Sequence, residues 1–161
     1  MKPSGRHETA EERLDRNWNE LLQELRITQT GLQLLSGFLL TLAFTQRFES
    51  LSAAQKHAYL ALVCLAAVAV ALNLTPVMLH RRLFGEHVKE RVVWVGHLTS
   101  QAVVILVALM VLGTTTFILW VVVGGTAAIV GGVLLAGVIV LLLVVTPFVV
   151  NHHGERIQRV P

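Results

Sequence analysis

Charged side chains are scarce in this 161-residue chain. Asp, Glu, Lys and Arg make up only 14% of it, whereas soluble domains average about 25%. Three stretches carry none of them, residues 27–46, 57–80 and 92–154, and each reaches or exceeds the ~20 residues of a membrane crossing. With 54% hydrophobic residues and a mean hydropathy of +0.66, the composition excludes a soluble globular domain. It predicts an all-α, polytopic membrane protein whose first partner is the lipid bilayer.

Cysteine is nearly absent as well. Cys64 is the only one, which excludes an internal disulfide and a thiolate metal cluster. The sequence contains no HExxH motif, phosphate-binding loop or nucleophile elbow, and no carboxylate pair inside an apolar stretch. Five histidines lie at the borders of the apolar stretches without metal-ligand spacing: His80, His87, His97, His152 and His153. We therefore expect no enzyme activity, no metal site and no cofactor.

The uncharged stretches divide into four predicted transmembrane helices. The first and second cover residues 27–46 and 58–79. The last stretch is too long for one crossing, and Gly124 with Gly125 marks the best break, so we predict helices at 96–119 and 126–150. The polar parts are an N-terminal segment at 1–26, connections at 47–57, 80–95 and 120–125, and a tail at 151–161.

Basic residues are distributed unevenly between the two sides of this arrangement. Eleven Lys and Arg residues fall in the N-terminal segment, the second connection and the tail, against two in the first connection and none in the last. The positive-inside rule therefore predicts that both termini are cytoplasmic. The net charge of +3 is scattered over short segments and forms no single basic face, which argues against nucleic-acid binding. The first 26 residues, which include six acids, do not have the pattern of a secretory signal.

An amphipathic helix is predicted over residues 10–26. Thr9 and Glu12 have the spacing of a capping box at its start. Large apolar residues recur at three- and four-residue intervals after it: Leu14, Trp18, Leu21, Leu22 and Leu25. We interpret this apolar face as an interfacial anchor that meets headgroups or the helix bundle. The alternative is a docking surface for a cytoplasmic protein partner.

Polar residues form a stripe along the first predicted crossing: Arg26, Gln29, Gln33 and Ser36. They fall within an arc of about 80° on an α-helix. We expect the stripe to face protein, where interhelical hydrogen bonds contribute on the order of 0.6 to 2 kcal/mol each. The alternative is a polar cavity that opens to the cytoplasm and is completed by His97, Thr99, Ser100 and Gln101 at the start of the third crossing.

Small residues recur every four positions on the fourth predicted crossing: Gly124, Ala128, Gly132 and Ala136. Such a face lets another helix approach closely. The neighbour is either a helix of the same chain or a second copy, which would make the protein a homo-oligomer.

Two prolines lie near the inner ends of predicted crossings. Pro76 and Pro147 each follow a threonine. Because proline has no N–H and leaves one helical carbonyl unpaired, we predict a kink at each, with the threonine hydroxyl helping to satisfy the freed carbonyl.

The most specific sequence signature lies at residues 12–48, which read ERLDRNWNELLQELRITQTGLQLLSGFLLTLAFTQRF. This segment resembles a bacterial family of small four-helix membrane proteins of unknown function, frequent in high-GC Gram-positive bacteria. The resemblance continues through Tyr59, Pro76 and the HRRLF stretch at 80–84. It implies a multi-pass protein of the bacterial cytoplasmic membrane and supplies no catalytic residues. Some relatives carry the name sodium:proton antiporter.

Two functional hypotheses are compatible with this pattern. The first is a non-enzymatic membrane protein whose N-terminal helix and cytoplasmic connections form an interaction or regulatory surface, because polar sequence detail is concentrated between residues 9 and 36. The alternative is a small cation/proton antiporter, or a transporter component, that acts as an oligomer. Antiport requires an ionisable group within the bilayer, and His97 is the only candidate that these predicted crossings provide.

Overall fold

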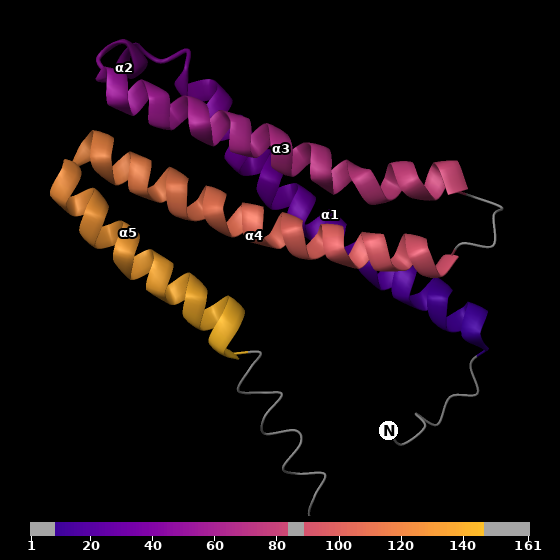
Figure 1. Cartoon of the computed structure of the whole chain (residues 1–161). Helices are drawn as coiled ribbons and strands as arrows, with labels where there is room; N and C mark the ends of the chain where they lie inside the picture. Colours follow the sequence, from indigo (N-terminus) through magenta and orange to yellow (C-terminus); the bar gives the residue numbers. More distant parts are fainter. Residues whose placement is uncertain (1–8, 84–88, 147–161) are drawn as a thin grey trace, which may run out of the picture.

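Helices account for nearly all of the residues that the structure describes. The structure is a computed structural model and describes residues 9–83 and 89–146 (Figure 1). Its elements are α1 (Ala10–Leu42), α2 (Gln46–Glu49), α3 (Ala53–Leu83), α4 (Lys89–Val122), α5 (Gly125–Val140) and a π-helical turn, η1 (Leu141–Val145). Within these two ranges there is no strand, so the predicted all-α class is confirmed for them.

Side-chain caps determine where α1 and α3 begin. The Thr9 backbone N–H donates to Glu12 Oε2 at 2.8 Å, and the Glu12 N–H donates to Thr9 Oγ1 at 3.3 Å. Ser52 and Gln55 repeat the arrangement at the start of α3, at 2.9 and 3.3 Å. Each pair satisfies two N–H groups that would otherwise lack partners. α3 therefore begins at Ala53, earlier than the crossing predicted from residue 58.

The capping box makes the first turn of α1 sensitive to acid. Hydrogen bonds from the Thr9 backbone N–H and from its hydroxyl hold the pKa of Glu12 below its ordinary value of 4.5. A carboxyl with a lowered folded-state pKa stabilises the fold above its unfolded pKa, and this contribution is lost as pH falls through the folded value. We expect amide exchange in this turn, corrected for intrinsic rates, to accelerate below about pH 4. Glu12→Gln should abolish the acid step; an unchanged step in this variant would contradict the assignment.

α1 is a single helix of 33 residues that unites two predicted elements. The amphipathic helix at 10–26 and the first crossing at 27–46 follow each other without a break, because no proline separates them. α1 ends at Leu42, short of the predicted limit at residue 46. The Leu42 carbonyl accepts from the Thr45 backbone N–H at 3.1 Å and from the Thr45 hydroxyl at 2.8 Å, so the helix end has partners after the last turn.

Three helical stretches are long and apolar enough to cross a membrane: Ala53–Leu79, Val93–Val122 and Gly125–Val145. They correspond to the predicted crossings at 58–79, 96–119 and 126–150. The predicted connection at 80–95 is largely helical, since α3 extends to Leu83 and α4 begins at Lys89. The first predicted crossing is not among the three stretches, because glutamines and threonines interrupt the apolar residues of α1. Residues 1–8, 84–88, 147–150 and the tail at 151–161 lie outside the described residues.

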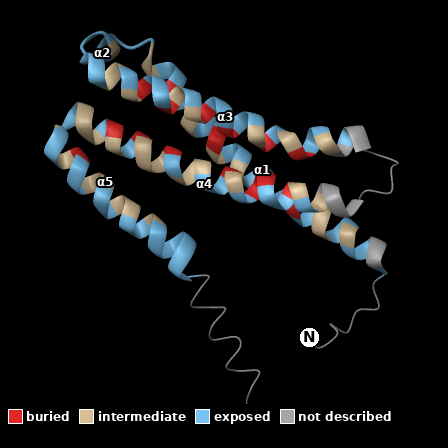
Figure 2. Cartoon of the chain, viewed as in Figure 1, coloured by how far each residue is buried: buried red, intermediate tan, exposed pale blue. Residues whose placement is uncertain are grey.

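α1, α3 and α4 pack side by side around one core, and α5 lies against α4 (Figure 1). Buried residues on the three packed helices recur at intervals of three, four or seven, which is typical of left-handed packing at small crossing angles. They include Leu21, Leu25, Leu32 and Leu39 on α1, Tyr59, Leu62, Ala66, Ala69, Asn73 and Pro76 on α3, and Ser100, Val103, Met110, Thr114 and Phe117 on α4, where Thr99 is buried as well. Figure 2 shows most of α5 exposed, and Ala128 is its one buried residue.

The first connection and the α4–α5 turn lie at the same end of the bundle. Arg47 Nη2 donates to the Val121 carbonyl at 3.1 Å, near the end of α4 where carbonyls lack helical partners. The chain reverses at Val123 and Gly124, within the predicted connection at 120–125. Gly124 adopts a φ of 124°, which other residues rarely adopt. Consecutive long helices are therefore antiparallel.

α3 runs through Pro76 as one continuous helix. The proline side chain is fully buried, and its missing N–H leaves the Leu72 carbonyl without its helical donor. The Thr75 hydroxyl donates to the Ala71 carbonyl at 3.2 Å, one position before the carbonyl that the sequence prediction assigned to it. Pro147, the other predicted kink, lies outside the described residues.

Candidate functional site

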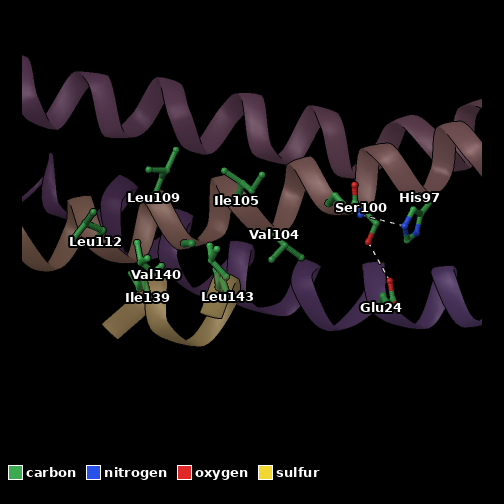
Figure 3. A pocket seen from close by; sticks show the side chains of 13 residues that line it. Glu24, His97, Ser100, Val104, Ile105, Leu109, Leu112, Ile139, Val140 and Leu143 are labelled. Carbon is green, nitrogen blue, oxygen red and sulfur yellow. Dashed lines mark hydrogen bonds between the residues drawn. The ribbon is translucent and has the colours of Figure 1, made fainter. Parts of the chain in front are cut away.

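A polar contact joins α1 to α4. The Ser100 hydroxyl donates to Glu24 Oε2 at 3.3 Å (Figure 3). Ser100 is buried, with 4% of its surface exposed, whereas Glu24 is exposed. Nearby on α4, Gln101 Nε2 lies 3.2 Å from His97 Nε2. Because an amide nitrogen only donates, the imidazole nitrogen is the acceptor. We call Glu24, His97, Ser100 and Gln101 the polar site.

The polar site occupies one end of an apolar groove between α4 and α5. The groove has a volume of about 520 Å³. Its other lining residues are aliphatic: Val104, Ile105, Ala108, Leu109 and Leu112 on α4, and Ile139, Val140, Leu143 and Val144 on α5 and η1. α5 diverges from α4 toward its C-terminal end (Figure 1). Figure 3 shows the labelled aliphatic side chains extending along both helices away from Glu24 and His97.

A second polar contact lies one turn along α1 from Glu24. The Thr28 hydroxyl lies 3.3 Å from Asn73 Oδ1 on α3 and 2.9 Å from the Leu25 carbonyl. Asn73 is buried, with 5% of its surface exposed, and such a group needs a hydrogen-bond partner. At 1.5 Å per residue, Asn73 lies about 9 Å from Leu79 and Ser100 about 10 Å from Val93. Both contacts therefore lie in the same half of the apolar helices, each about as far from the helix midpoint as from the nearer end.

The predicted stripe on α1 does not face the other helices of the same chain. Arg26, Gln29 and Gln33 are exposed, so the prediction is wrong for these three residues within one chain. The reason is that α1 turns its leucine face inward, and the stripe lies about 100° around the helix from it. Ser36 is half-buried, and its hydroxyl has no partner among the described residues.

The predicted polar cavity is found in a different form. His97 and Gln101 line the groove with Ser100, but none of the stripe residues does. Thr99 is buried and donates to the Val95 carbonyl at 2.8 Å. The acidic member of the site, Glu24, comes from the segment that sequence reasoning placed outside the first crossing. The sequence feature that could have indicated Glu24 is its position beside Leu21 and Leu25, at the edge of the apolar face of α1.

The predicted interaction face of α1 packs on α4. Leu21 and Leu25 are buried, and Leu14, Trp18 and Leu22 are half-buried. A Cβ added to Gly96 of α4 would lie 3.0 Å from Leu21 Cδ1 and 3.3 Å from Trp18 Cζ3. The helices approach closely at Gly96, and the leucine face is largely occupied within the chain.

The small residues of α5 also face a helix of the same chain. Ala128 is buried and Ala136 is half-buried. A Cβ added to Gly132 would lie 2.9 Å from Thr116 Oγ1 of α4, and Gly124 forms the turn. The helix that packs on these small residues, which the sequence did not identify, is therefore α4. A homo-oligomer would have to form through another surface.

No cluster of three or more His, Cys, Asp or Glu side chains suited to a metal occurs among residues 9–83 and 89–146. His87, His152 and His153 lie outside these residues, and Cys64 is exposed on α3.

Comparison with known families gives one match, whereas no curated protein and no solved structure matches the chain. The model of DUF6328, a family of unknown function, matches residues 7–147. The matched range includes all of the helices described above and every residue of the polar site. The chain belongs to this family, DUF6328.

Proposed function

We propose that the protein crosses a bacterial cytoplasmic membrane four times, with α1 as the remaining crossing and both termini in the cytoplasm. The helical part of the predicted crossing, from residue 27 to Leu42, covers about 24 Å, and the preceding turn of α1 extends it toward the ~30 Å of the hydrocarbon core. Leu32 and Leu39 of this segment are buried in the same core as α3 and α4, so α1 runs alongside two apolar helices. The Lys and Arg distribution supports the orientation. The polar site then lies in the cytoplasmic half of the bundle.

The activity that the geometry supports best is non-enzymatic binding of a cation at the polar site. The contact between Ser100 and Glu24 carries this proposal. It brings a carboxylate beside a residue within the apolar stretch Val93–Val122. Glu24 is exposed at the groove, and its negative charge attracts a cation there. The Ser100 hydroxyl and the Gln101 side chain are neutral polar groups that the bound cation would contact.

Few charged groups surround Glu24 among the described residues. The other polar residues that line the groove, His97, Ser100 and Gln101, come from α4 and include no acid and no Lys or Arg. α5 and η1 contribute no charge, since Gly125–Val145 contains no ionisable residue, and α3 contributes the neutral Asn73 next to Thr28. On α1 itself, Glu20 and Arg26 flank the site in sequence. Glu24 is therefore the carboxylate with which a cation in the groove would pair.

Substitution of Glu24 tests the proposal. We expect tetramethylammonium to bind the purified protein in lipid nanodiscs, with the affinity measured by isothermal titration calorimetry. Glu24→Gln should weaken this binding about fivefold, in line with the loss of one ion pair. Glu20→Gln is the matched control, because Glu20 is exposed and pairs with Arg16 at 3.1 Å, outside the groove. Equal tetramethylammonium affinities of all three proteins would contradict the proposal.

Cation/proton antiport is the second candidate, favoured by the same carboxylate. Transporter sites generally lie near the bilayer midplane, whereas the contact of Glu24 with Ser100 lies about as far from the helix midpoint as from the nearer end, so transport would require a further pathway or a second copy. The test is cation-dependent proton flux in liposomes with Na⁺ and K⁺. Flux that Glu24→Gln abolishes and Glu20→Gln preserves would support antiport. No flux from protein that still binds tetramethylammonium would reject transport and leave binding intact.

A cytoplasmic protein partner remains a prediction on different grounds. Because Leu21 and Leu25 are packed within the chain, such a partner would contact the exposed polar face of α1. Regulation by a partner there is compatible with cation binding at Glu24.

A further inference from the structure

We propose that the ligand of the polar site is an amphiphile with a cationic head and an aliphatic tail, and that the groove between α4 and α5 holds the tail. This inference rests on the cation binding proposed above and specifies the class of cation. It is carried by the juxtaposition of Glu24 with a long aliphatic groove.

The charge of the lining residues favours a ligand with a cationic head. Within the part of the chain that the structure describes, Glu24 is the one acidic residue that lines the groove, and no Lys or Arg residue lines it. An anionic head would face the carboxylate with no opposing basic side chain among the lining residues. A cationic head would instead pair with Glu24 and contact the side chains of Ser100 and His97.

The length of the groove and its aliphatic lining favour a ligand with an alkyl tail. The nine remaining lining residues are all aliphatic, and none of the lining residues is aromatic. From Ser100 to Leu112 the groove follows α4 for about 18 Å, which suits an extended alkyl chain. Its volume of about 520 Å³ lies within the ~300 to 1,000 Å³ that is usual for small-molecule sites.

The groove has its polar end and its aliphatic end in the same order as the headgroup and tail of a lipid in the adjacent leaflet. Glu24 and Ser100 lie in one half of the apolar helices, and the aliphatic lining extends from there toward their midpoints. An amphiphile in the adjacent leaflet would therefore keep its head toward the interface and its tail in the apolar region when it enters the groove between α4 and the diverging α5 (Figure 3).

Selectivity should come from the head and much less from the tail. Lipid tails are as apolar as the groove, so an alkyl chain gains little hydrophobic free energy when it leaves the bilayer. At equal mole fraction in the membrane, a cationic amphiphile should bind about five- to tenfold more tightly than a neutral one with the same tail.

Photo-cross-linking in nanodiscs tests this inference. The probe is an alkyltrimethylammonium with a twelve-carbon tail that carries a diazirine near its end, where twelve is chosen to suit the roughly 18 Å groove. We expect cross-links on Ile105, Leu109 and Leu143 to exceed those on Leu60 and Leu74, which are exposed on α3. A neutral probe with the same tail should give about five- to tenfold less groove labelling.

Two variants separate the roles of head and tail. Glu24→Gln should remove the preference for the cationic probe while leaving the groove in place. Ala108→Phe should fill the groove and abolish groove labelling, whereas Ala67→Phe, at an exposed position of α3, should not. Wild-type circular dichroism and thermal unfolding in each variant would establish that it is folded.

The outcomes distinguish this inference from the proposed function. Cross-links spread evenly over α3, α4 and α5, with tetramethylammonium still bound by the protein, would overturn the amphiphile and leave cation binding standing. Groove labelling that is equal for cationic and neutral probes would also overturn it. If neither tetramethylammonium nor the amphiphile binds, both proposals are wrong.

Discussion

Leu32→Ala is expected to destabilise the folded protein by about 2 to 4 kcal/mol. Leu32 is 1% exposed and belongs to the core that α1 forms with α3 and α4. Shortening its isobutyl side chain to a methyl group leaves a cavity whose surrounding side chains lose packing contacts. The effect should appear in equilibrium unfolding in mixed micelles, monitored by circular dichroism.

Leu34→Ala is the matched control for this prediction. Leu34 lies two residues away on the same helix and is 72% exposed, so its truncation should change the free energy of unfolding by less than about 0.5 kcal/mol. Equal effects of the two substitutions would show that α1 does not pack on α3 and α4 through its leucine face.

Gly132→Leu is expected to separate α5 from α4 and to destabilise the protein by about 1 to 3 kcal/mol. A Cβ at position 132 would lie 2.9 Å from Oγ1 and 3.4 Å from Cγ2 of Thr116. Thr116 is β-branched and has few alternative rotamers in a helix, so the backbones must move apart. Thermal unfolding measures the loss of stability, and spin labels on α4 and α5 measure the separation.

Gly137→Leu provides the comparison on the same helix. No atom lies within 4 Å of a Cβ at position 137, so this side chain would extend into lipid or the open side of α5. A wild-type separation and stability for Gly132→Leu would refute the close packing of α5 on α4.

The sequence predicted the helices well because it marks their limits chemically. Capping boxes at Thr9 and Ser52 mark the starts of α1 and α3, and Gly124 marks the reversal before α5. α3 and α4 extend past both ends of the predicted crossings, because counting uncharged residues measures the apolar core while the backbone hydrogen bonds continue past it. α1 instead ends at Leu42, before the predicted limit at residue 46. The first predicted crossing stays a prediction, since polar side chains dilute the apolar residues of α1.

The faces of the helices were harder to predict. In α3 and α4 nearly every residue is apolar, so the hydrophobic pattern does not distinguish a core position from a lipid-facing one. The small and polar residues were the ones that indicated which face of each helix is buried. Ala66, Ala69 and Asn73 follow the three-and-four spacing of the buried face of α3, as expected where helices associate through close packing and hydrogen bonds within lipid.

The candidate site depended on packing between segments far apart in sequence. Glu24 and Ser100 are separated by 76 residues, and no local pattern connects them. The stripe at Gln29 and Gln33 was a genuine helical pattern, but its orientation depends on which face of α1 the other helices select. The buried leucines decide that orientation, and they leave the glutamines exposed.

The position of α1 in the membrane is the central claim, because it places Glu24 at the cytoplasmic end of the apolar groove. In a Cys64→Ser background, single cysteines replace Gln23 and Ser50, which are exposed and lie on either side of the proposed crossing. A membrane-impermeant maleimide is applied to intact cells and then to opened membranes. The account predicts that Ser50→Cys reacts from outside and that Gln23→Cys reacts only after the membrane is opened. Labelling of both from the same side would show that α1 does not cross.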